Sequence, residues 1–294
     1  CWNNDDTNGR KQRFDGLYIH GDADGRHEHD DDGELHGGRW RDEQVFPLVR
    51  PRFTPYYLHP DGRLGTDPPL ETSSSTTYRF DPGDPVPTIG GNLSSVQGLL
   101  SAGGFDQRCR PETLFARAQI PLSERRDVLV FQTEPLEADL EVTGPIEVVL
   151  HVSSSAVDTD FTAKLIDVYP PHPDYPVGFD LNVGDSITRL RYRSSLERAE
   201  LAHPGEAYTV RIHPYPIANL FAKGHRIRLD VSSSNFPRFD VNPNTGEPLQ
   251  EHRRVIAADN TVFHDGARPS HVVLPHTYQT RDFVPMLAAR LNRS

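Results

Sequence analysis

The sequence predicts an all-β protein, a jelly-roll β-sandwich built from short antiparallel strands. Apolar and polar residues alternate in several segments, as at Ile146, Val148, Leu150 and Val152, which is typical of a strand with one buried face. The 26 prolines and 22 glycines separate these segments with turns. Because no helical patterns are interleaved with them, the sheets are expected to be antiparallel. About eight strands in two sheets indicate a jelly roll.

The first segment of the chain differs from the rest. Residues 1–34 are dense in Asp, Gly, His and Asn, with one small apolar island at residues 14–19. Such a composition buries too little apolar surface to offset the entropy lost on ordering. We therefore predict a poorly ordered lead over residues 1–38.

The jelly roll itself is predicted over residues 39–283. Within it, residues 81–108 are rich in Pro and Gly and are expected to form a long covering loop rather than a free linker. The loop carries six apolar anchors: Val86, Ile89, Leu93, Leu99, Leu100 and Phe105. A short helical tail is predicted over residues 284–294, where apolar residues recur at helical spacing.

The clearest strand runs into a long polar loop. Ile227, Leu229 and Val231 alternate with charged residues, and the serine run Ser232–Ser234 then ends the strand. Serine side chains at that place can bond backbone groups of the loop. The loop carries Phe236 and Phe239 among Asn, Asp and Pro, so we expect it to pack back on the sheet.

Composition excludes several classes of partner. Lys and Arg total 31 against 42 Asp and Glu, a net charge of −11, which argues against nucleic acid and anionic membranes. No signal peptide or run of about 18 apolar residues is found.

The two cysteines, Cys1 and Cys109, are expected to be free thiols in a reducing, cytoplasmic compartment. A lipidated Cys1 is the alternative. Since the only methionine is Met286, we expect a partial or processed product.

Nucleophilic catalysis finds no support in the sequence. An α/β-hydrolase presents its serine on a strand-to-helix turn, usually G-x-S-x-G, and no serine here has that context. Both His225 and His264 lie near strand ends, where a hydrogen-bonding role is predicted. A Ser-His-Asp site assembled from loops is the alternative. No catalytic residue is predicted, and the chain alone is expected to be inactive.

Metal and cofactor sites are not predicted either. The His- and Asp-rich stretch between His20 and His36 has no EF-hand spacing, because the twelfth position is Arg39 rather than Glu, and a solvated acidic segment is predicted there. Asp158, Asp160 and Asp167 could hold calcium, but turn capping is the favoured interpretation.

A basic triple, Arg189, Arg191 and Arg193, alternates with Leu190 and Tyr192. We interpret it as a solvated or interdomain face of a strand rather than a phosphate site.

Several ordered sequence blocks between residues 38 and 276 resemble one family. They include RWRDEQVFP, HPDGRLGTDPP, FDPGDPVPTIGGN, GGFDQR, NLFAKGHRIRLDVSSSNFPRFDVNPNTGE and TVFHDGARPSHVVLP. These blocks are similar to the C-terminal, non-catalytic domain of the CocE/NonD hydrolases, which are X-Pro dipeptidyl-peptidases and cocaine-esterase-like enzymes. The lead over residues 1–38 is not matched by this resemblance.

The resemblance implies both a fold and a partner. In such enzymes this domain is a galactose-binding-like jelly roll that packs on an α/β-hydrolase domain and its helical cap. The catalytic triad belongs to the hydrolase domain, so no catalytic residue carries over to this chain. Leu99, Leu100 and Phe105 are the implied candidates for a substrate wall or interdomain contact. A stand-alone galactose-binding-like module that binds a ligand or carbohydrate is the alternative, by analogy of fold alone.

Overall fold

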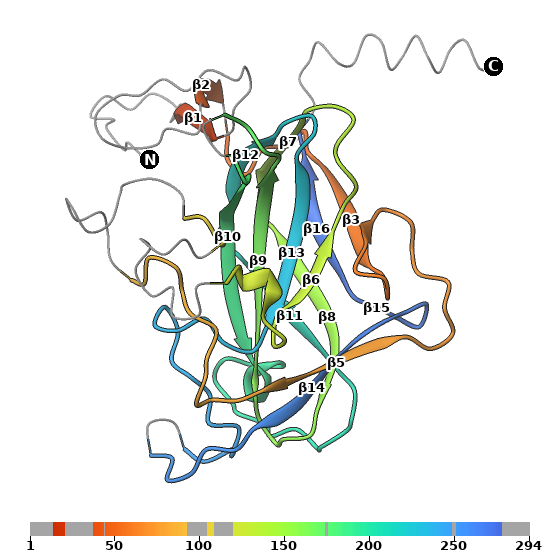
Figure 1. Cartoon of the computed structure of the whole chain (residues 1–294), viewed down its shortest axis with the longest axis vertical. Helices are drawn as coiled ribbons and strands as arrows, with labels where there is room; N and C mark the ends of the chain where they lie inside the picture. Colours follow the sequence, from red (N-terminus) through yellow and green to blue (C-terminus); the bar gives the residue numbers. More distant parts are fainter. Residues whose placement is uncertain are drawn as a thin grey trace.

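The computed structural model describes residues 14–20, 38–43, 45–92, 105–108, 120–173, 176–248 and 251–277. These residues form two sheets (Figure 1). The smaller sheet has the strand order β10-β9-β13-β6, and the larger has β15-β14-β8-β16-β7-β12-β1-β2 with β3, β4, β5 and β11 attached beside this path. Among the strands that the structure describes, β1 and β12 pair in parallel and every other pair is antiparallel.

The strands and 3-10 turns have the following bounds. They are β1 Phe14–His20, β2 Gly38–Glu43, β3 Arg52–Leu58, β4 Leu64–Gly65, β5 Ser75–Phe80, η1 Leu122–Glu124, β6 Leu129–Gln132, β7 Leu140–Gly144, β8 Glu147–Ser154, β9 Asp160–Tyr169, β10 Phe179–Arg189, η2 Leu190–Tyr192, β11 Tyr208–Ile212, β12 Ile217–Phe221, β13 Arg226–Ser232, β14 Ala258–Asp265, β15 Arg268–Pro269 and β16 His271–His276.

The hydrophobic core lies between the two sheets. Its largest fully buried side chains include Phe80, Phe161 and Phe221, which come from β5, β9 and β12. The alternation in the sequence selects the inward face, because Leu150 of β8 and Leu229 of β13 are both buried in this cluster. The predicted all-β class with antiparallel sheets is therefore confirmed.

Part of the predicted poorly ordered lead is a strand. Residues Phe14–His20 pair with β2, and His20 lies opposite Asn219 of β12. The expectation of disorder is wrong for these seven residues, since pairing with a neighbouring strand satisfies their backbone groups and Phe14, Tyr18 and Ile19 favour a strand. Residues 1–13 and 21–37 of the lead and the predicted helical tail over 284–294 lie outside the described residues.

No helix in the part of the chain that the structure describes is long and apolar enough to span a bilayer.

Candidate functional site

Three segments cover the outer face of the smaller sheet: residues 81–92, 105–108 and 120–128. In Figure 1 the turn η1, which belongs to the third segment, lies in front of this sheet. A second apolar cluster joins the segments and consists of Val86, Ile89, Leu122 and Val128, with Phe105 and Val130 packed against it. The prediction that residues 81–108 cover the sheet is thus confirmed for their described part.

Of the three predicted wall residues, the structure describes Phe105 alone. Phe105 is partly buried in the second cluster, where its ring lies directly over Gly90. Leu99 and Leu100 lie outside the described residues. A role for the three in an interdomain contact stays a prediction.

The covering segment is fixed to the loop that follows β13. Backbone hydrogen bonds run in both directions, from Thr88 N to Phe236 O at 2.6 Å and from Phe236 N to Val86 O at 2.9 Å. Side chains add to them: Val86 N donates to Ser234 Oγ at 2.9 Å, and Thr88 Oγ1 donates to Asn235 Oδ1 at 2.9 Å. The run that ends β13 therefore holds the covering segment in register. The serine run also binds the backbone of its own loop, as predicted, because Ser232 Oγ donates to Ser234 O.

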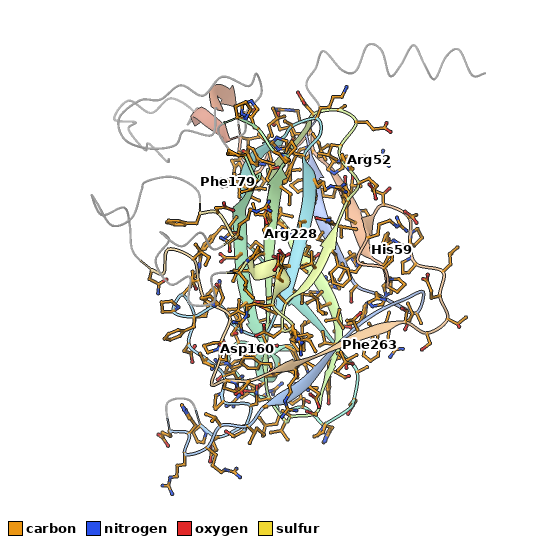
Figure 2. All side chains as sticks on the ribbon, viewed as in Figure 1. Arg52, His59, Asp160, Phe179, Arg228 and Phe263 are labelled. Atoms are coloured by element: carbon orange, nitrogen blue, oxygen red, sulfur yellow. The ribbon has the colours of Figure 1, made fainter. Side chains whose placement is uncertain are left out.

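Beneath this cover lies a buried ion network centred on Arg228, labelled in the middle of Figure 2. Its guanidinium donates to Asp180 Oδ2 at 2.7 Å and lies 2.9 Å from Asp230 Oδ1. Nearby, Lys164 Nζ donates to Gln107 Oε1 at 3.3 Å. Arg228 and Asp230 of β13 are consequently buried, and Gln107 of the covering segments binds Lys164 on the neighbouring strand β9.

A second polar network ties one end of the smaller sheet to the loop after β13. Asn242 Nδ2 donates to Asp158 Oδ2 at 2.9 Å and to Asp160 Oδ1 at 2.8 Å. Arg191 Nε donates to Asp158 at 2.7 Å, and Arg189 binds Asp160 through Nε and Nη2 at 2.8 and 3.0 Å. Burial raises the pKa of Asp160 to about 6, although Arg189 and Asn242 favour its charged form.

These contacts correct two interpretations from the sequence. Asp158 caps a turn as predicted, because its Oδ1 accepts from Arg191 N at 2.9 Å within the 3-10 turn η2, and it also pairs with the Arg191 side chain. The Asp160 carboxylate is instead a buried partner of Arg189. The basic triple does not form a solvated strand face, because β10 ends at Arg189 and the chain then makes a 3-10 turn. That turn directs Arg191 inward, where only 6% of the residue is exposed.

A cavity of about 360 Å³ lies beside this network. Arg189 and Arg191 line it together with the loop after β13 and a segment ending at Val255. The other lining residues are Pro82, Phe236, Asp240, Val241, Pro243, Glu247, Pro248 and His252. This cavity was not predicted from the sequence, where the cluster of Asn, Pro and Phe after β13 is its signal.

The two histidines considered for catalysis have structural partners. His225 Nδ1 lies 2.8 Å from Asp167 Oδ1, and this pair is buried. His264 bonds Ser74 through Nδ1 at 2.8 Å and Thr76 through Nε2 at 2.9 Å. A catalytic triad needs a carboxylate on the second ring nitrogen of its histidine, and Thr76 occupies that place. The predicted hydrogen-bonding role is confirmed for both.

Burial sets the protonation tendencies of these groups. It raises the pKa of Asp167, against the stabilising contacts of His225 and Asn219. It lowers the pKa of His264, which favours the neutral ring. Among the described residues no group of three His, Cys, Asp or Glu side chains could hold a metal ion.

Comparison with known proteins identifies the family. The model of the X-Pro dipeptidyl-peptidase C-terminal non-catalytic domain matches residues 17–273. The chain belongs to this family. The resemblance to CocE/NonD hydrolases drawn from the sequence blocks is therefore confirmed, and the match begins inside the segment 1–38 that the resemblance left out.

Individual relatives agree with this assignment. The chain is 42% identical to cocaine esterase of Rhodococcus sp. (strain MB1 Bresler) over 246 residues, which are 80% of this chain and 39% of that protein. An aminopeptidase from a marine sediment archaeon (Thaumarchaeota) has a TM-score of 0.70 at 27% identity, over 82% of this chain and 39% of its own. An α-amino acid ester hydrolase also has a TM-score of 0.70, at 29% identity, over 83% of this chain and 40% of its own. The chain thus spans about two fifths of the length of these relatives.

Proposed function

We propose that this chain is the C-terminal accessory domain of a serine hydrolase and acts by packing on an α/β-hydrolase catalytic domain and walling its active site. The observation that carries the proposal is the match over residues 17–273 to a family described as non-catalytic. The relatives are roughly two and a half times as long as the matched region. Their additional length provides room for the catalytic domain.

The finer fold assignment is part of the same proposal. We interpret the two antiparallel sheets as a galactose-binding-like jelly roll. The strand order supports this interpretation, because β8 has β11 on one side and β14 and β16 on the other, and these neighbours are distant in sequence. Such long-range pairing is typical of Greek-key sandwiches.

The substrates of the parent enzyme are proposed from the relatives. The matched proteins are named as an esterase, an aminopeptidase and an amino acid ester hydrolase. The reaction class common to these names is hydrolysis of an ester or an amide, with X-Pro peptides as a further candidate from the family description. Leu99, Leu100 and Phe105 remain the proposed contacts with substrate or catalytic domain.

The cavity beside Arg189 favours a second candidate function, a stand-alone ligand-binding module. Ligand pockets are concave, mostly apolar and carry a few placed polar groups, and the lining of this cavity fits that description. The two functions differ in one respect: an accessory domain requires a catalytic domain for its effect, whereas a module binds its ligand alone.

An activity assay tests the proposal directly. The purified chain should turn over a p-nitrophenyl ester and a Gly-Pro amide no faster than a denatured control, because it offers no activated nucleophile with oriented base and oxyanion donors. The protein encoded by the complete gene should hydrolyse one of these substrates, and deletion of residues 17–277 should abolish that activity. A serine-directed phosphonate that labels a serine within this chain and stops turnover would contradict the proposal.

A further inference from the structure

The cavity beside Arg189 combines apolar walls with guanidinium donors. Six of its lining residues are apolar: Pro82, Phe236, Val241, Pro243, Pro248 and Val255. Two of them are substantially exposed, Phe236 at 43% and Val255 at 58%. A ligand with an apolar body would remove these side chains from water, which is favourable in proportion to the area covered.

The polar side of the cavity is held in place before any ligand arrives. Arg191 donates from Nε to Asp158 and from Nη2 to the Glu247 carbonyl at 3.1 Å. Arg189 uses Nε and Nη2 for Asp160, and Nη2 also lies 3.2 Å from Asp240. The hydrogen bonds of both arginines to other described residues use Nε and Nη2 and leave Nη1 unused, and both residues line the cavity. Each fixed guanidinium therefore keeps the two N–H groups of Nη1 for a ligand.

The acidic residues on the lining are already engaged. Glu247 accepts from Thr245 Oγ1 and from Arg253 N, and Asp240 binds Arg189. We propose that this cavity binds the carboxylate of an apolar acid, with Arg189 Nη1 and Arg191 Nη1 as donors and the walls around Phe236 and Val255 holding the apolar body. A carboxylate provides the acceptor geometry that guanidinium groups match best.

The recognition is local, since the chain as a whole is acidic with a net charge of −11. Diffuse attraction cannot give such a protein a preference for anions. A measured preference for an acid over its neutral amide therefore reports on the cavity. The inference does not depend on the accessory role, because the cavity lies entirely within this chain.

The source of the carboxylate is either a free acid or a peptide C-terminus, and matched pairs distinguish the two. The probes are 3-phenylpropionate with 3-phenylpropionamide, and N-acetylphenylalanine with its C-terminal amide, titrated into the full chain by calorimetry or NMR. A charge-assisted hydrogen bond is about twice as strong as a neutral one, so each acid should bind about tenfold more tightly than its amide. The tighter of the two acids identifies the source.

Substitutions at the exposed rim test the location without disturbing the fold. Val255→Asp places a like charge beside the ligand and Val255→Lys an opposite one, and their affinities for 3-phenylpropionate should differ on the order of tenfold. Val177→Asp is the matched control, since Val177 is exposed to 61% and does not line the cavity; it should bind like the unaltered chain. Equal binding of acid and amide, no binding at millimolar concentration, or equal affinity of the two Val255 variants would each overturn the proposal.

Discussion

Removal of the Asp158 carboxylate is expected to destabilise the fold strongly. Its side chain is fully buried and accepts three hydrogen bonds, from Arg191 N at 2.9 Å, Arg191 Nε at 2.7 Å and Asn242 Nδ2 at 2.9 Å. Asp158→Ala leaves the buried guanidinium of Arg191 without its counter-charge. Breaking a buried pair in this way costs about 3–5 kcal/mol of unfolding free energy, which is a large share of the stability of a typical domain.

Equilibrium urea unfolding of Asp158→Ala measures this cost, and Asp259→Ala serves as the control. Asp259 pairs with Arg79 at 3.4 Å, but both side chains are more than half exposed, so its loss should cost less than about 1 kcal/mol. The double variant Asp158→Leu/Arg191→Met should be more stable than Asp158→Ala, because an apolar pair removes the unpaired charge. Similar costs for Asp158→Ala and Asp259→Ala, or no recovery in the double variant, would refute the assignment of Asp158 as the buried counter-charge.

Three other predictions follow from single residues. Burial lowers the pKa of His276 from 6.5 to about 4, so on acidification the unfolded chain binds a proton before the folded chain does. The free energy of unfolding should therefore fall by about 2 kcal/mol between pH 6.5 and 4, after allowance for partial solvent contact. His276→Met should lack this loss when the variant and the unaltered chain are unfolded in urea across that range. Thr88→Val removes the hydrogen bond to Asn235 Oδ1, which should lower the free energy of unfolding by about 1–2 kcal/mol. Hydrogen exchange of the backbone amide at position 88 should become faster, and unchanged exchange would contradict the anchoring role. Phe161→Ala should cost about 3–5 kcal/mol by leaving a core cavity, and Phe53→Ala, at 54% exposure, should cost far less in the same thermal or urea unfolding measurement.

The periodic pattern of apolar residues determined the fold class and the inward face of the strands. Ile227, Leu229 and Val231 were predicted to face the core, and all three are fully buried there. The covering role of residues 81–108 was also predicted from the sequence, because apolar side chains such as Val86 and Ile89 require a surface to pack on. These features depend on local sequence. Because alternate side chains of a strand point to opposite faces of the sheet, apolar residues at every second position must all face the core.

The means by which the loop after β13 is held could not be predicted from its residues. Two phenylalanines suggested apolar packing, but Phe236 is 43% exposed. Asparagines hold the loop instead: Asn242 binds Asp158 and Asp160, and Asn244 donates to Ile256 O at 2.7 Å. An asparagine is equally compatible with a solvated turn, so its partners become known only when the chain is folded.

What the sequence alone determined is the all-β class, the family and the covering segment, because each depends on residue order along the chain. Tertiary structure decided which charges are internal. Arg191 reads as part of a solvated face in the sequence, yet its partner Asp158 lies 33 residues away on the approach to a neighbouring strand. Burial of a charge is favourable only when an opposite charge is fixed beside it, and that pairing is a property of the fold. The cavity between Arg189 and Phe236 arises for the same reason, since its walls come from segments that only folding brings together.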